Sequence, residues 1–258
     1  MLGLGIGLGL AHRYAAAVEG GDPGGGGGFY PTDVENLTHM WDMHDSPRYS
    51  DAAGTTLIGA GDQVCAAIRD LKSGRLLFQG TEAYRATIIR GVQNGRDVLR
   101  MGEHGYFSGT PPFGLAINYE ETLILIERIT STGDGRRTLD SNNSYCNICG
   151  SRSNGNSCYV NGAPVSDYYV SSGCHMLRLW IPEHYSSSKM AYFVDEVDRT
   201  DTQLPPNNWG ELQVGKVPGW GAYPQSDVCC IMRIHPDPSA EDIANIHAWA
   251  VATWGTPA

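Results

Sequence analysis

The chain has 258 residues, with 18 lysines and arginines against 28 aspartates and glutamates, so its net charge is −10. General binders of nucleic acid or of anionic membranes need a basic surface, so this charge excludes both classes. Only 18% of the residues are charged, and the chain holds 33 glycines, 14 prolines and 13 tyrosines, which predicts turns and short strands rather than helices or disorder.

Residues 1–28 differ in composition from the rest of the chain. Their apolar residues alternate with glycines: Leu2, Leu4, Ile6, Leu8 and Leu10. This period of two places all the apolar side chains on one face of an extended strand, and a glycine-rich linker follows. Glycine contributes no packing, so we expect the segment not to fold alone. Two interpretations stay open: a disordered tail, or an anchoring arm whose strand is added to a partner.

Targeting signals and cysteines bear on the location of the protein. No stretch approaches 18 consecutive apolar residues, so no transmembrane helix is predicted. Arg13 follows the first apolar run instead of preceding it, which argues against a signal peptide. The seven cysteines are an odd set without a regular framework, which favours reduced thiols and synthesis in the cytoplasm.

Residues 29–258 are predicted to form one globular unit. Short apolar runs recur between turn signals and predict strands. The predicted strands are Val98–Met101, Ala116–Ile117, Thr122–Ile129, Ser157–Val160, Met176–Ile181, Met190–Val194, Glu211–Val214 and Val228–Ile234. Thr122–Ile129 is the most hydrophobic and is expected at the centre of a sheet. Asn161-Gly162 predicts a hairpin turn, because both residues tolerate positive φ.

Two segments are predicted to be helical, the short Val34–Trp41 and the longer Ser239–Trp254. Ser239 is a natural N-cap, and Gly255 ends the second helix. Many antiparallel strands and one terminal helix predict a two-sheet sandwich covered by that helix. The side chains expected to bury the helix are Ile243, Ile246 and Trp249 or Val251, and those expected to face the sandwich interior are Leu123, Leu125, Trp180 or Phe193.

Three stretches, taken in order, resemble the concanavalin A-like (laminin-G-type) jelly-roll domains of phage and bacterial surface proteins. They are Pro31–Asp45, then Ile68–Gly74 with Asn94–Gly102, then Glu211–Gly215 with Ser239–Gly255. The resemblance covers residues 31–256 and implies an all-β fold: a concanavalin A-like β-sandwich (jelly roll) with a C-terminal helix and an extended Gly-rich N-terminal arm. Ile68 and Met101 replace usual aromatic residues of the family, so the implied fold carries no ligand chemistry with it.

The N-terminal Leu/Gly repeat also resembles the leader of tailed-phage virion proteins that carry such domains. Together the resemblances imply a non-enzymatic bacteriophage virion protein for capsid decoration or tail-fibre contact with the host surface. The implied partners are other virion proteins, a second copy of the chain and a host-surface glycan, with no nucleic acid, membrane or cofactor. The implied location is the virion, after synthesis in the host cytoplasm. The alternative is a glycan-active hydrolase or carbohydrate-binding module of the jelly-roll class.

Loops rich in Tyr, Trp and Asn supply candidate carbohydrate contacts. Aromatic faces pack against sugar C–H surfaces, and amides hydrogen-bond to hydroxyl groups. The candidates are Asn142, Asn143, Tyr145, Trp209, Trp220 and Tyr223. Ordinary loop composition and protein–protein packing stay open as explanations of the same residues.

One acidic run, Glu196-Val-Asp198-Arg-Thr-Asp201, approaches the Glu-x-Asp-x-x-Glu pattern of jelly-roll glycoside hydrolases. In that pattern two carboxylates about 5–5.5 Å apart serve as nucleophile and general acid. The same run also matches the solvated hairpin turn that the jelly-roll resemblance implies after Tyr192–Asp195. We favour the turn and expect no catalytic residue here.

Cysteines and histidines were weighed as metal ligands. Cys146 and Cys149 have the Cys-x-x-Cys spacing of a zinc site, and Cys158 and Cys174 follow at loose spacings. Buried or free thiols, disulfides and a metal stay open, and we expect no zinc. Cys229 and Cys230 are adjacent in a predicted strand and are expected on opposite faces. The histidines at positions 39, 44 and 104 match no ligand spacing.

Overall fold

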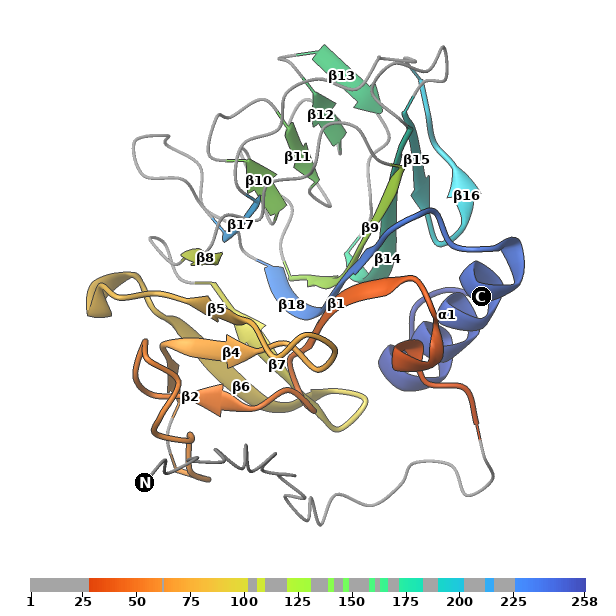
Figure 1. Cartoon of the computed structure of the whole chain (residues 1–258). Coiled ribbons are helices and arrows are strands. Elements are labelled where there is room, and N and C mark those ends of the chain that lie inside the picture. The colour runs from red at the N-terminus through yellow and green to blue at the C-terminus, as the bar shows by residue number, and fades with distance from the viewer. Residues whose placement is uncertain are drawn as a thin grey trace, which may run out of the picture.

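The computed structural model describes residues 28–61, 63–101, 106–109, 120–130, 139–141, 146–148, 158–160, 163–166, 172–182, 190–201, 212–215 and 226–258. Two β-sheets and a C-terminal helix dominate this part of the chain, which confirms the predicted all-β sandwich with a terminal helix (Figure 1). The predicted anchoring arm, with Leu2, Leu4, Ile6, Leu8 and Leu10, lies outside the described residues. None of the described helices has the length and apolar character needed to cross a membrane.

Both sheets are antiparallel. In spatial order, sheet A contains β16 (Val197–Asp198), β15 (Ala191–Val194), β14 (Gly173–Ile181), β9 (Glu121–Ile129), β18 (Ser226–Ile234), β7 (Arg96–Arg100), β6 (Ala86–Gln93) and β3 (Val64–Cys65), with β1 (Leu37–Asp42) also paired to β18. Sheet B contains β13 (Ala163–Ser166), β12 (Cys158–Val160), β11 (Cys146–Ile148), β10 (Leu139–Ser141), β17 (Leu212–Gly215), β8 (Tyr106–Gly109), β5 (Leu76–Phe78), β4 (Ala67–Arg69) and β2 (Arg48–Tyr49). The helices are η1 (Pro31–Asp33), η2 (Glu82–Tyr84) and α1 (Ala240–Trp254).

The first apolar layer lies between the two sheets. Leu77, Phe107 and Val214 enter it from sheet B, and Leu123 and Leu125 enter it from β9 of sheet A. None of these five residues is more than 2% exposed. The predicted inward direction of Leu123 and Leu125 and the central place of their strand are therefore confirmed.

The second apolar layer lies between the other face of sheet A and α1. Ile124 and Ile126 of β9 contribute to it, together with Met232 of β18 and Ile246 and Trp254 of α1. Successive residues of β9 thus alternate between two buried layers. A strand that is buried on both faces needs a continuous apolar run, which explains the composition of Thr122–Ile126.

Trp180 and Phe193 do not face the sandwich interior, so this part of the predicted core is wrong. Leu179 and Tyr192 occupy the interior layer instead, and the pleat turns their chain neighbours Trp180 and Phe193 to the helix side of sheet A. Both aromatic residues are half-buried there. A shift of one residue in the assumed phase exchanges the two faces of a strand.

Residues 34–41 form no α-helix, contrary to the prediction. Leu37–Asp42 is strand β1, which pairs with β18 through Met40 opposite Met232 and Trp41 opposite Ile231. Met40 and Trp41 are both buried but lie in different apolar layers. A short apolar run fits a buried strand and a helix equally well, so pairing with β18 decides the outcome.

The C-terminal helix agrees with its prediction. The Ser239 hydroxyl accepts a hydrogen bond from Asp242 N, and the Asp242 carboxylate accepts one from Ser239 N, which forms a capping box. Gly255 ends the helix at a φ of 70°, a left-handed conformation that favours glycine. Ile246 and Trp249 are buried against sheet A, as expected.

Two turns within the stretches that resemble the jelly-roll family have local structural explanations. Asp70 Oδ1 accepts hydrogen bonds from Met40 N at 2.9 Å and from Lys72 N at 2.7 Å, so this carboxylate fixes the β4–β5 hairpin. Asn94 and Gly95 have φ values of 49° and 75° between β6 and β7. This is the two-residue hairpin that an Asn-Gly pair favours. Both motifs therefore serve folding.

Candidate functional site

The predicted carbohydrate-contact residues lie outside the described part of the chain: Asn142, Asn143, Tyr145, Trp209, Trp220 and Tyr223. They remain predictions from the sequence. Trp220 and Tyr223 lie in the segment that joins Gly215, the last residue of β17, to Ser226, the first residue of β18.

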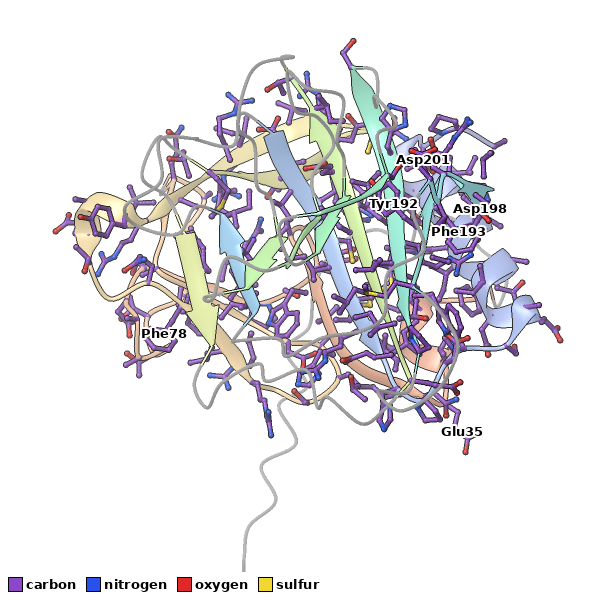
Figure 2. The ribbon with its side chains drawn as sticks, turned by 90° about the horizontal axis from the view of Figure 1, so that it is seen from above. Glu35, Phe78, Tyr192, Phe193, Asp198 and Asp201 are labelled. Carbon is purple, nitrogen blue, oxygen red and sulfur yellow. The ribbon has the colours of Figure 1, made fainter. Side chains whose placement is uncertain are left out.

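The acidic run forms a hairpin turn, as favoured from the sequence. Asp195 and Glu196 have φ values of 49° and 59° between β15 and β16. Glu196 accepts two hydrogen bonds from Arg178, while Asp198 is exposed and accepts one from Thr200 N at 2.9 Å. Figure 2 labels Asp198 at the edge of the molecule, beside Phe193 and the terminal helix. These contacts occupy both carboxylates in the turn, so they are not a catalytic pair.

Three of the four cysteines that are candidate zinc ligands belong to described strands, and these strands lie in different sheets. Cys146 and Cys158 belong to β11 and β12 of sheet B, and Cys149 lies outside the described residues. Cys174 is buried on the helix side of sheet A, away from the interior that faces sheet B. Within the described ranges, no group of three or more His, Cys, Asp or Glu side chains is placed to hold a metal ion.

Cys229 and Cys230 do not point to opposite faces, which corrects the expectation from strand alternation. The register of β18 against β9 shifts between Val228 and Cys230, and both thiols join the layer beneath α1. A β-bulge of this kind interrupts the alternation of side chains. Cys229 Sγ lies 3.9 Å from Cys174 Sγ without a disulfide, and burial raises the pKa of the Cys229 thiol, which favours its protonated form.

Two of the three histidines have structural contacts, and His104 lies outside the described residues. His39 is buried and stacks on Trp41 with ring centroids 5.3 Å apart. Burial lowers the pKa of His39 to about 4. His44 Nδ1 accepts a hydrogen bond from Asp97 N at 3.0 Å, and burial lowers the pKa of this imidazole as well. Both rings are neutral at pH 7.

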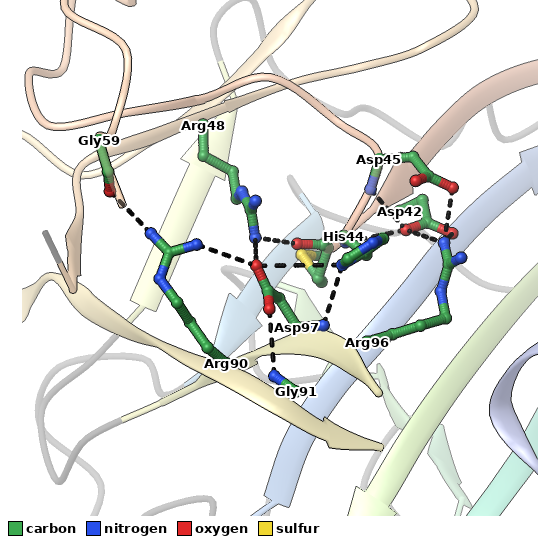
Figure 3. Close-up of polar contacts among 10 residues, drawn as sticks. Asp42, His44, Asp45, Arg48, Gly59, Arg90, Gly91, Arg96 and Asp97 are labelled. Atoms are coloured by element: carbon green, nitrogen blue, oxygen red, sulfur yellow. Dashed lines mark hydrogen bonds and ion pairs between the residues drawn. The ribbon is translucent and has the colours of Figure 1, made fainter. Parts of the chain in front are cut away.

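Figure 3 shows a cluster of charged residues near the β6–β7 hairpin. Asp97 accepts hydrogen bonds from Arg48 at 2.8 Å, from Arg90 at 3.2 Å and from Gly91 N at 3.1 Å. Its side chain is only 10% exposed. These bonds hold β6 and β7 together and tie them to Arg48 of β2, so the cluster has a structural role.

The second half of the cluster centres on Asp42, which is fully buried at the end of β1. Asp42 accepts hydrogen bonds from His44 N and Asp45 N, and Arg96 Nη2 lies 3.2 Å from both of its carboxylate oxygens. Burial raises the pKa of Asp42 to about 6, against the opposing effect of the Arg96 charge. A group this deeply buried has no surface for a ligand.

One end of sheet A carries polar side chains and also receives the segments that connect the two sheets. We call it the Gly173 end: the end at which β9 stops at Ile129, β14 starts at Gly173 and β18 starts at Ser226. Segments of the chain that join sheet A to sheet B meet these three strand ends, because β10 follows β9, β13 precedes β14 and β17 precedes β18. Connections at the ends of sandwiches often carry binding residues.

His175 and Asp195 form a hydrogen-bonded pair at the Gly173 end. His175 Nδ1 lies 2.7 Å from Asp195 Oδ2, and their side chains are 10% and 11% exposed. Met176 N donates to the other oxygen, Asp195 Oδ1, at 2.9 Å. Because a carboxylate only accepts hydrogen bonds, the imidazole donates from Nδ1 and presents Nε2 as an acceptor when it is neutral.

The surroundings of His175 are polar and charged. On β9 the residue directly opposite is Glu127, which is fully buried. On the other face of the same end, buried Asp227 accepts hydrogen bonds from Arg100 at 2.7 and 2.9 Å and from Arg128 at 3.4 Å. These two arginine side chains are 45% and 34% exposed. The Gly173 end therefore offers both hydrogen-bond acceptors and partly exposed cations.

His175 and Asp195 were not predicted as site residues, because they are 20 residues apart and match no motif. Register brings them together, since Leu177 pairs with Val194 and the next positions outward are Met176 and Asp195. Correct pairing of β14 with β15 would have predicted this proximity. The notable signal in the sequence was Asp195 at the predicted hairpin turn.

No protein-family model matches the chain, and no curated protein sequence is significantly similar to it. Solved structures are similar in fold. A mutant of Trypanosoma rangeli sialidase displaying trans-sialidase activity is 9% identical, with a TM-score of 0.51 over 84% of this chain and 33% of that chain. A GH54 α-L-arabinofuranosidase soaked with a cyclic sulfate inhibitor is 14% identical, with a TM-score of 0.51 over 74% of this chain and 51% of that chain.

These structures belong to glycoside hydrolases, which contradicts the expectation of a non-enzymatic bacteriophage virion protein. The expected lack of enzymatic activity is corrected with it, because both similar structures are of enzymes. The comparisons show no link to a phage particle. At 9–14% identity the likeness itself establishes the fold. The chain spans about a third of the sialidase and about half of the arabinofuranosidase. The expected partners and location stay predictions from the sequence.

Proposed function

We propose that this chain is a carbohydrate-active β-sandwich protein of the concanavalin A-like jelly-roll class, and that it binds a saccharide at the Gly173 end of sheet A. The main support is the likeness in fold to parts of a sialidase and an arabinofuranosidase, both of which act on glycosidic substrates by their names. The stretches Ile68–Gly74 and Asn94–Gly102 support the jelly-roll class through their resemblance to that family.

The chemistry of the Gly173 end favours a saccharide as the ligand. Sugars present many hydroxyl groups, and the end supplies a buried hydrogen-bond acceptor at His175. Trp220 and Tyr223 lie in the segment that joins β17 to β18 at this end, and aromatic faces suit the apolar side of a sugar ring. Both aromatic residues stay predictions from the sequence.

Hydrolysis of a glycosidic bond is a second candidate, because both similar structures belong to glycosidases. Binding is the primary proposal because the chain spans only 33% and 51% of those two proteins. Glu196 and Asp198 are not candidates for the catalytic pair. Release of a fluorogenic aglycone from aryl glycosides, measured with the same preparation, separates hydrolysis from binding alone.

The test is binding of the purified full chain to an array of neutral and acidic oligosaccharides, followed by calorimetric titration of the ligands that bind. Trp220→Ala and Tyr223→Ala are expected to weaken binding at least about tenfold, equivalent to about 1.4 kcal/mol. Phe193→Ala is the matched aromatic control, because Phe193 is half-buried on the other face of sheet A, and this variant is expected to bind normally. Phe78→Ala tests sheet B. If Phe193→Ala or Phe78→Ala loses binding while Trp220→Ala and Tyr223→Ala bind normally, the proposed location is contradicted.

A further inference from the structure

One atom at the Gly173 end has an unused hydrogen-bonding capacity. His175 Nε2 is buried and has no hydrogen-bond partner among the described residues. A buried polar group without a partner costs about 1–3 kcal/mol, so an isolated acceptor of this kind is rare in folded proteins. We infer that His175 Nε2 accepts a hydrogen bond from a hydroxyl group of the bound saccharide, an inference that rests on the proposed function.

The direction of this acceptor is fixed by Asp195. The carboxylate is held from both sides, since Oδ1 accepts from Met176 N and Oδ2 faces His175 Nδ1. Asp195 N also donates to Met176 O at 2.8 Å, which ties the turn to β14. The ring therefore cannot rotate without breaking a short hydrogen bond, and the neutral tautomer keeps its lone pair on Nε2. A ligand meets an acceptor whose orientation is already set.

Gly173 leaves room for a ligand next to that atom. A Cβ at position 173 would come within 3.3 Å of His175 Nε2, so a side chain there would cover the acceptor. Gly173 is exposed and has a φ of 141°, a conformation that favours glycine. The acceptor thus lies one layer beneath an exposed residue that contributes no side chain.

The neighbouring charge favours a donor-rich ligand. The Nε2 atom of neutral His175 can only accept a hydrogen bond, so it favours an O–H donor. The carboxyl group of Glu127 lies directly opposite on β9 and disfavours an anionic group at this point. The hydroxyl groups of a saccharide meet this requirement, and the predicted contribution of His175 is selectivity for a hydroxyl at one ring position.

Two substitutions separate ligand contact from structural support. His175→Asn retains a donor near the position of Nδ1, so the hydrogen bond to Asp195 is kept while the Nε2 acceptor is lost. His175→Gln places its amide near the position of Nε2, so an acceptor is restored while the bond to Asp195 is lost. For an oligosaccharide that the array identifies, we expect His175→Asn to raise Kd at least about tenfold, and His175→Gln to recover part of the loss.

Each outcome decides the inference. Long-range proton–nitrogen NMR of the wild-type chain should show the Nε2 resonance of His175 shifting when the same oligosaccharide is added. If the oligosaccharide binds His175→Asn with an unchanged Kd and leaves Nε2 unshifted, the inference is overturned and the proposed function stands. If no saccharide on the array binds the wild-type chain and no aryl glycoside is hydrolysed, the proposed function fails and takes this inference with it. Urea unfolding of both variants identifies a loss of binding that comes from unfolding.

Discussion

Glu196 holds Arg178 through two hydrogen bonds, from Nε at 2.9 Å and from Nη2 at 2.6 Å. The guanidinium carbon of Arg178 lies 3.7 Å from the centroid of the Phe193 ring. The ion pair of Glu196 with Arg178 therefore holds the β15–β16 hairpin to β14 on the helix side of sheet A. Its neighbour Asp195 serves the opposite face through His175, so one turn supplies two carboxylates to two faces of the sheet.

The first prediction concerns the stability of this turn. Glu196 has a φ of 59°, which costs a non-glycine residue about 1 kcal/mol relative to glycine. Glu196→Ala loses the ion pair and keeps that cost, whereas Glu196→Gly loses the pair and removes the cost. We expect urea unfolding to show that the glycine variant is about 1 kcal/mol more stable than the alanine variant. Equal stabilities would show that the turn is not strained.

The second prediction concerns acid sensitivity. Burial lowers the pKa of His39 to about 4 from an ordinary value of 6.5, so the unfolded chain binds the proton more tightly than the folded chain. The contribution of neutral His39 to the free energy of unfolding is fully present above pH 6.5 and is lost as the pH falls toward 4. The loss by pH 5 is about 2 kcal/mol. Chemical unfolding from pH 7.5 to pH 4.5 should show this decline in the wild type and a smaller one in His39→Gln. An identical pH dependence in both proteins would contradict the assignment.

The third prediction concerns the buried charge at Asp42. Arg96→Met leaves this fully buried carboxylate without its cation, which should cost about 3–5 kcal/mol at pH 7. Because the pKa of Asp42 is already raised to about 6, protonation should reduce that cost at pH 5. The double variant Asp42→Asn with Arg96→Met removes both charges and should recover most of the lost stability. A double variant as unstable as Arg96→Met would show that Arg96 acts through its packing on Trp254.

The fourth prediction concerns the docking of α1. Trp254 is fully buried, its ring packs under Arg96, and its carbonyl accepts a hydrogen bond from Gln93 of β6. Trp254→Ala should lower the free energy of unfolding by about 3–5 kcal/mol. Thr253→Ala, at the partly exposed neighbouring position, should change it by less than about 0.5 kcal/mol. Similar losses in both variants would contradict the claim that burial of Trp254 against sheet A docks the helix.

The sequence predicted the elements whose signals are local. Ser239 and Gly255 marked both ends of α1, and the apolar run at Thr122–Ile126 marked the central strand. The helix predicted at Val34–Trp41 is wrong, because the segment pairs as β1 with β18 and the residues of β18 lie almost 200 positions away in the sequence. The prediction that Trp180 and Phe193 face the sandwich interior is wrong for the same reason, since only strand pairing fixes which face of a strand is inside.

The candidate site depends on register even more strongly. His175 and Asp195 meet because β14 pairs with β15, and Glu127 joins them because β14 pairs with β9. No spacing rule connects these three residues along the chain. Strand alternation does not predict the positions of Cys229 and Cys230, because a β-bulge places both thiols in one layer.

The central claim is that a saccharide binds at the Gly173 end of sheet A, and mapping of backbone amide resonances tests it most directly. A uniformly labelled chain is titrated with an oligosaccharide that the array identifies, and the shifted amides are located on the sheets. We predict that the largest shifts occur at Gly173, His175, Asp195 and Ser226, where β14, β18 and the β15–β16 turn share this end. Shifts confined to α1, to the charged cluster around Asp97 or to β4 and β5 of sheet B would contradict the claim.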